Sequence, residues 1–147
     1  MTPLSDVFAP DLIVTNDDGT KWELIVDARS RSTHLAEVES QLKEYMLEIG
    51  CPLGLLATPR IIRLYHDEYL DEESVKLVGE YPAPVDWAAW EERVGTGFES
   101  VVLHWLENLV TESSLHSFPA DFRRAIQRYL WPVLDRGEVR AARPWSD

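Results

Sequence analysis

The sequence has few cysteines, few basic residues and no long apolar run. Its one cysteine, Cys51, can form no internal disulfide and has no second thiol with which to share a metal ion, which excludes disulfide scaffolds and zinc ribbons. No apolar run approaches the roughly 18 residues that cross a bilayer. Residues 1–10 lack a basic region followed by a hydrophobic stretch, so we expect a cytoplasmic location and no membrane partner.

The shortage of basic residues bears on function. Fourteen Lys and Arg against 26 Asp and Glu give a net charge of −12. Residues 1–120 hold 22 acidic and 8 basic side chains, whereas residues 121–147 hold 4 and 6. Because proteins contact phosphates mainly through basic side chains, tight binding of DNA by this chain alone is disfavoured, and we expect a protein partner or self-association.

The hydrophobic pattern changes near residue 81. Before it, short β-rich runs surround one amphipathic helix, and after it the pattern is helical. The expected strands are 12–15, 22–27, 53–58, 61–65 and, on weaker signals, 74–79, with the helix at 33–49 ending at Gly50. The fold class is therefore α/β: a mixed sheet of four to five strands with one packed helix forms residues 1–80, and a helical subdomain or arm packed on it forms residues 81–147.

The turn between the first two strands decides which residues share a face. A two-residue loop would place Asp11 opposite Val26, so that Asp11 and Asp27 would face opposite sides of the sheet. A type I turn over Asp17 and Asp18 with Gly19 in the left-handed conformation is a three-residue loop, and it pairs Asp11 with Ile25 instead. Because side chains alternate along a strand, Asp11, Asp27 and Arg29 would then share one face.

The C-terminal part predicts three helices rich in aromatic residues. A short one spans 86–93, a second follows a capping box formed by Thr96 and Glu99, and a third spans about 122–130. Pro132 should end or kink this third helix, because proline lacks the N–H that a helix needs. The tryptophans Trp87, Trp90 and Trp105 occupy helix positions, where core packing or docking is a better interpretation than base stacking.

The order of several short motifs resembles the PD-(D/E)XK nuclease-like superfamily. Pro10-Asp11, a hairpin and then Asp27-Ala28-Arg29 follow the superfamily's strand–turn–strand pattern. Gln41 and Tyr45 on the following helix resemble the QxxxY element of some branches, and the likeness continues through residues 54–65. About 60 residues, 10 to 69, are covered, and the resemblance implies a restriction-endonuclease-like fold.

The resemblance also implies a metal site. Asp11 and Asp27 would be ligands of Mg²⁺, or of Mn²⁺ as a substitute, with the carbonyl of Ala28 as a third, while Gln41 and Tyr45 would hydrogen-bond near the same site. Two carboxylates on adjacent strand ends suit such hard cations, and a metal so held activates water and neutralises phosphodiester charge. Arg29 stands where the pattern has lysine, and guanidinium can bind phosphate but cannot serve as a base.

Superfamily members also carry a glutamate-bearing helix, and usually a strand, ahead of the first aspartate. Only ten residues precede Asp11, so these parts are absent here unless another chain supplies them or the sequence is a fragment.

Each residue of the motif also has an ordinary structural interpretation. Asp11 suits the start of a strand, Asp27 and Arg29 suit an ion pair at a strand end, Gln41 suits the polar edge of a helix stripe, and Tyr45 suits a core position. Two functions therefore stay open. The first is Mg²⁺-dependent phosphodiester hydrolysis on DNA, as a subunit or remnant of a restriction or defence nuclease. The second is a catalytically inactive nuclease-like module that binds a protein partner through its acidic surface and its Trp- and Arg-rich C-terminal helices.

Overall fold

A six-stranded mixed sheet organises the molecule in the computed structural model, which describes residues 10–31, 34–68, 74–91, 97–109 and 118–141. Its strands are β1 (Leu12–Thr15), β2 (Trp22–Ala28), β3 (Leu53–Ala57), β4 (Ile61–Asp67), β5 (Val75–Pro82) and β6 (Glu138–Ala141). Its order is β5-β4-β3-β2-β1-β6, and every neighbouring pair is antiparallel except β2 and β3. The parallel pair is joined by helix α1 (Leu35–Ile49), as a parallel connection requires.

The expectation of four to five strands was therefore too low by the strand β6. This strand comes from the C-terminal part of the chain, which was expected to be helical, and it pairs along the outer edge of β1 from Leu12↔Ala141 to Thr15↔Glu138. The sheet thus contains segments from both sides of the expected boundary at residue 80, because β5 also runs on to Pro82.

The β1–β2 hairpin has the predicted turn but a longer connection. Gly19 is left-handed (φ 75°) and its N–H donates to the carbonyl of Asn16 at 3.1 Å, as a turn over Asp17 and Asp18 requires. Asn16, however, pairs with Lys21 rather than Thr20, and a bulge then leaves Glu23 without a partner in β1. The register becomes Leu12↔Val26, so Asp11 lies level with Asp27 and not with Ile25.

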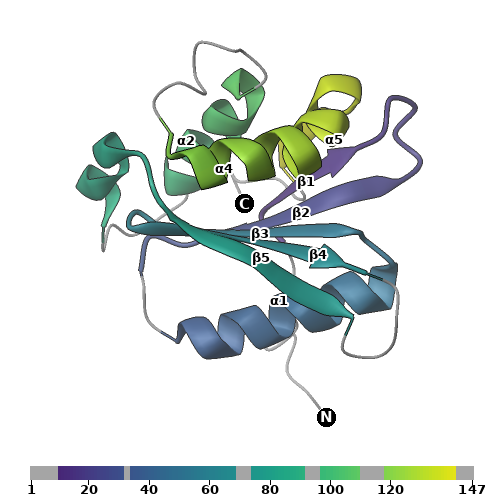
Figure 1. The fold of residues 1–147 in the computed structure, drawn as a ribbon, viewed down its shortest axis with the longest axis horizontal. Helices are drawn as coiled ribbons and strands as arrows, with labels where there is room; N and C mark the ends of the chain where they lie inside the picture. The colour runs from purple at the N-terminus through teal and green to yellow at the C-terminus, as the bar shows by residue number, and fades with distance from the viewer. Residues whose placement is uncertain (1–9, 32–33, 69–73, 92–96, 110–117, 142–147) are drawn as a thin grey trace.

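Helices cover both faces of the sheet (Figure 1). On one face α1 packs the buried side chains of Val38, Leu42 and Met46 against a cluster that includes Ile13 and Ile25. Gly50 ends α1 in the left-handed conformation (φ 71°), as expected. His34, just before the helix, is also left-handed, and Thr33 lies outside the described residues.

The opposite face is covered by the C-terminal helices. These are η2 (Val85–Trp90, 3-10), α2 (Gly97–Asn108) and a continuous 17-residue helix made of α4 (Ala120–Ala125), the π-helical segment η3 (Ile126–Leu130) and α5 (Trp131–Arg136). Their buried side chains form one cluster with the sheet, in which Trp87 is 2% exposed and stacks edge-on with Phe98 and Trp105. The interpretation of Trp87 as a core residue is confirmed, and Thr96 of the capping box lies outside the described residues.

Pro132 does not end the last helix, which continues to Arg136. The π-helical segment immediately before it has a physical cause: Pro132 cannot donate the hydrogen bond that an α-helix would direct to the carbonyl of Arg128. The chain therefore widens one turn and continues.

Two further findings concern Cys51 and the length of the helices. Cys51 is 1% exposed, its thiol donates to the carbonyl of Leu53 at 3.3 Å, and burial raises its pKa to about 11, so it acts as a small buried hydrophobic residue. Among the helices that the structure describes, none is long and apolar enough to cross a membrane.

The docking of β6 depends on Gly137, and this yields a prediction. A Cβ at Gly137 would collide with the backbone carbonyls of Thr15 and Val133, neither of which can move without distorting β1 or α5. We expect Gly137→Ala to lower the free energy of unfolding by about 1–3 kcal/mol, measured by urea denaturation, and to accelerate amide exchange in β1. Glu138→Ala, which truncates an exposed neighbouring residue, is the control. Equal stability of the two variants would contradict the proposed role of Gly137 in the docking of β6.

Candidate functional site

The two predicted metal ligands lie side by side where β1 begins and β2 ends. Both side chains face the α1 side of the sheet, as Ile13 and Ile25 do, and both are buried: Asp11 is 8% exposed and Asp27 is 3% exposed. The N–H of Asp11 donates to the carbonyl of Val26 at 2.8 Å, which holds the start of β1 against β2. Two carboxyl groups are thus brought together in a site with little access to water.

Hydrogen bonds fix the orientation of both carboxyl groups. The backbone N–H of Ala28 donates to Asp11 Oδ2 at 2.8 Å, and the Nε of Arg29 donates to Asp27 Oδ2 at 2.8 Å. Arg29 is itself held at the end of β2, because its backbone N–H donates to the carbonyl of Ala57 at 2.9 Å. Its side chain is 42% exposed, so the guanidinium reaches from the solvent into the buried pair.

The pair holds a proton. Burial, followed by the hydrogen bond to Asp27 and the negative charge of Asp27, raises the pKa of Asp11 to about 9, although the hydrogen bond from the Ala28 N–H opposes this rise. At neutral pH Asp11 is therefore a neutral acid whose hydroxyl group can donate to Asp27. Asp11 and Arg29 are thus both hydrogen-bonded to Asp27.

A third acidic residue adds to the negative charge that acts on Asp11. Glu99, in the first turn of α2, lies close enough for its charge to raise the pKa of Asp11. The sequence carried no signal for this role, because Glu99 lies 88 positions beyond Asp11 and fitted a capping box. In the described part of the chain, no group of three or more His, Cys, Asp or Glu is close enough to hold a metal ion together.

The helix residues of the motif do not join the acid pair. Gln41 is exposed, and its side chain makes no hydrogen bond to any described residue. Tyr45 is half-buried against the α1-side cluster, and burial, followed by the charge of Glu48, raises its pKa. Since a helix rises 1.5 Å per residue, these positions lie about 9 and 15 Å along the axis from Leu35, the end of α1 that follows β2. Gln41 is exposed on the helix and Tyr45 packs against the core, which agrees with the ordinary structural interpretation of each residue.

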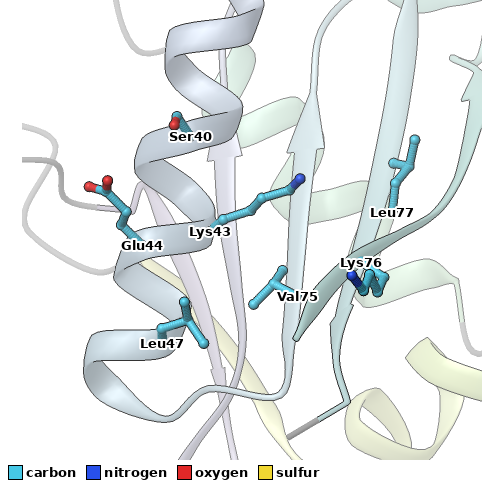
Figure 2. A pocket seen from close by; sticks show the side chains of 7 residues that line it. All are labelled: Ser40, Lys43, Glu44, Leu47, Val75, Lys76 and Leu77. Carbon is cyan, nitrogen blue, oxygen red and sulfur yellow. The ribbon is translucent and has the colours of Figure 1, made fainter. Parts of the chain in front are cut away.

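A groove between α1 and β5 is separate from the acid pair. It has a volume of about 500 Å³, and Lys43 projects across it from α1 (Figure 2). Lys43 Nζ lies 3.8 Å from Glu39 Oε1 and over the ring of Tyr65, so its charge is paired on its own helix. None of the residues of the predicted metal site lines this groove.

Comparison with known proteins adds nothing to this geometry. No protein-family model, no curated protein and no solved structure matches the chain.

The oxygen atoms of Asp11 and Asp27 supply some of the ligands that a hard divalent cation requires. Asp11 and Asp27 offer converging oxygens, and an ion such as Mg²⁺ fills its remaining positions with water. The N–H of Ala28 donates to Asp11, and the carbonyl of Ala28 as a third ligand stays a prediction. A cation at this place would have to replace the proton of Asp11, so the two compete.

The raised pKa of Asp11 predicts a pH-dependent stability. The unfolded carboxyl group loses its proton near pH 3.8 and the folded one near pH 9, so between these values the folded protein binds more protons, and its stability falls as pH rises. Asn at position 11 keeps an acceptor for the Ala28 N–H and an N–H to donate to Asp27. We expect Asp11→Asn to be about 1–3 kcal/mol more stable than the parent at about pH 8.5 and to have a flatter profile, measured by urea denaturation. Parallel profiles would contradict a protonated Asp11.

Competition between proton and cation predicts the pH dependence of metal binding. We expect weak Mn²⁺ binding by calorimetry that strengthens as pH is raised from about 6.5 to 8.5, because the cation must displace the proton. Asp27→Asn should abolish it, whereas Asp135→Asn, an exposed acid on α5, should not. Identical traces for Asp27→Asn and the parent protein would eliminate the metal site.

Proposed function

We propose that this chain is a metal-dependent phosphodiesterase with a restriction-endonuclease-like core that acts on DNA, as a subunit or remnant of a restriction or defence nuclease. The observation that carries the proposal is the convergence of Asp11 and Asp27 on adjacent strand ends. Paired carboxylates in a water-poor site are the arrangement that metal-assisted phosphodiester hydrolysis needs.

The residues of the acid pair take defined roles in this proposal. Asp11 and Asp27 would hold the cation, and the Ala28 carbonyl is the third oxygen that the resemblance implies. A bound Mg²⁺ or Mn²⁺ would supply Lewis-acid activation of water and neutralise charge on the phosphate. Arg29 would exchange its bond to Asp27 for one to a phosphate oxygen, since guanidinium donates to both groups in the same geometry. Asp11 would release its proton when the cation enters.

Two features of the fold support the nuclease-like core. The edge of β1 that the superfamily fills with an N-terminal strand is filled here by β6 from the other end of the chain. The acidic helix residue expected ahead of the first aspartate has a counterpart in Glu99 of α2, whose charge acts on Asp11. Within the described residues, the outer edge of β1 is thus paired, and an acidic helix residue acts on Asp11.

A second candidate is a catalytically inactive nuclease-like module. The ion pair between Arg29 and Asp27 favours it, because this cation already neutralises the carboxylate that a metal would use. The exposed position of Gln41 points the same way. Such a module would bind a protein partner, or a second copy of the chain, through its acidic surface and its Trp- and Arg-rich C-terminal helices.

Plasmid nicking separates the two candidates and is our test of the proposal. With Mn²⁺ at low salt we expect slow nicking, because a protein of charge −12 repels DNA, and moderate salt should increase the rate by screening that repulsion. Asp27→Asn should reduce nicking by at least about 100-fold, and Arg29→Lys should maintain or increase it. Asp135→Asn is the matched control, because it makes the same charge change on an exposed helix position.

The outcome for the acid pair decides between the functions. Nicking that survives Asp27→Asn would come from a contaminant and would refute the proposal. No nicking by the parent or by Arg29→Lys, at any salt concentration and with a basic partner added, would favour the binding module.

A further inference from the structure

A second hollow lies on the face of the sheet opposite the acid pair. It opens between β5 and the helix formed by α4 and η3, has a volume of about 620 Å³ and is lined by residues that include Tyr81, Asp121, Arg124, Arg128 and Tyr129. This volume is in the range of small-molecule sites. The elements that form it are packed together: the ring of Tyr81 on β5 stacks on Phe122 of α4 with centroids 4.3 Å apart.

Two arginines give this hollow a positive charge in an acidic protein. Arg124 and Arg128 are both exposed and follow one another along the helix at a spacing of four. Neither forms an ion pair with a carboxylate in the part of the chain that the structure describes, although the sequence has 26 acidic residues. Arg128 lies over the ring of Tyr129, with its guanidinium 5.4 Å from the ring centroid, which leaves its N–H groups able to donate to a ligand.

The hydroxyl group of a largely buried tyrosine lines the same hollow. Tyr81 is 5% exposed, and its hydroxyl group packs over the Cα of Gly79, where a larger residue would collide with it. This hydroxyl forms no hydrogen bond with any described residue. Burial, followed by the charges of Asp121 and Tyr129, raises the pKa of Tyr81, so the group remains a neutral donor. The hydroxyl group is therefore available to donate to an acceptor atom of a ligand in the hollow.

Asp121 narrows the class of ligand. Its Oδ1 accepts the N–H of Phe122 at 2.8 Å, and its second oxygen stays an acceptor at the rim of the hollow. A carboxylate repels a bare anion but accepts hydrogen bonds from hydroxyl groups. The lining therefore offers two guanidinium groups and a phenol for an anion, and one carboxylate for hydroxyl groups attached to it.

We propose that this hollow, named here the Arg124–Arg128 pocket, binds a hydroxyl-bearing phosphate monoester of the sugar-phosphate class. The phosphate lies between Arg124 and Arg128, because a dianion matches two guanidinium forks, and it accepts a hydrogen bond from the Tyr81 hydroxyl. The hydroxylated carbon skeleton lies against Tyr129 and donates to Asp121. This binding site lies on the other face of the sheet from Asp11 and Asp27 and does not depend on the proposed hydrolysis.

Titration with ribose 5-phosphate, followed by amide NMR shifts at low salt, tests the pocket. We expect saturable shifts in α4, η3 and β5, with a dissociation constant below about 10 mM. Arg124→Gln and Arg128→Gln should each weaken binding about tenfold, since each removes a charge-assisted hydrogen bond, and Tyr81→Phe should weaken it a few-fold while its ring keeps stacking on Phe122.

The controls separate this pocket from charge effects and from the acid pair. Arg123→Gln makes the same charge change on the same helix outside the lining and should leave binding unchanged, as should Asp27→Asn. Melting temperatures of all variants show that each remains folded. Absence of shifts at about 10 mM ribose 5-phosphate, or equal affinity in Arg123→Gln and Arg128→Gln, overturns the proposal. Equal affinity for inorganic phosphate overturns the assignment of an organic ligand.

Discussion

The rest of the structure depends on the need to cover both faces of the central strands. All five residues of β3 and the last five of β2 are buried, so these strands are apolar on both faces and require a layer on each side. Helix α1 supplies one layer, and the helices after residue 84 supply the other. The same two helical layers also bury Asp11 and Asp27, because these residues lie at the ends of strands whose central residues are covered on both faces. The burial that raises the pKa of Asp11 is therefore a consequence of sheet packing.

It was predictable that the two aspartates share a face of the sheet, because an even number of extra residues in the hairpin does not change the face to which each side chain points. The predicted three-residue loop and the observed hairpin differ by two residues, Thr20 in the loop and Glu23 in the bulge. An even difference keeps Asp11 and Asp27 on one face while it moves the partner of Asp11 from Ile25 to Asp27. The sequence pattern could not place the bulge, because Glu23 carries no turn signal.

The features that sequence reasoning missed all depend on contacts between distant segments. The strand β6 has four residues of alternating exposure, which is too short a pattern to distinguish from a loop, and it forms only because β1 presents a free edge. Glu99 acts on Asp11 only because α2 packs across the sheet. Gln41 fitted a motif by spacing alone, and spacing does not specify how far along α1 the acid pair lies. Local patterns thus predicted the elements, whereas the composition of the site required the tertiary fold.

The distribution of charge gives the two faces of the sheet different chemistry. Around Asp11 and Asp27, with the charge of Glu99 acting from α2, negative charge is in excess, and it is reduced by a proton on Asp11 and by Arg29 on Asp27. A divalent cation would serve the same electrostatic purpose, so proton and cation are alternative occupants of one site, and binding of one must release the other. On the opposite face Arg124 and Arg128 lack carboxylate partners among the described residues, so positive charge is in excess there despite the net charge of −12. An anion on that face and a cation on the first would each neutralise a local excess, so ligands of opposite charge can bind the same small domain without competing.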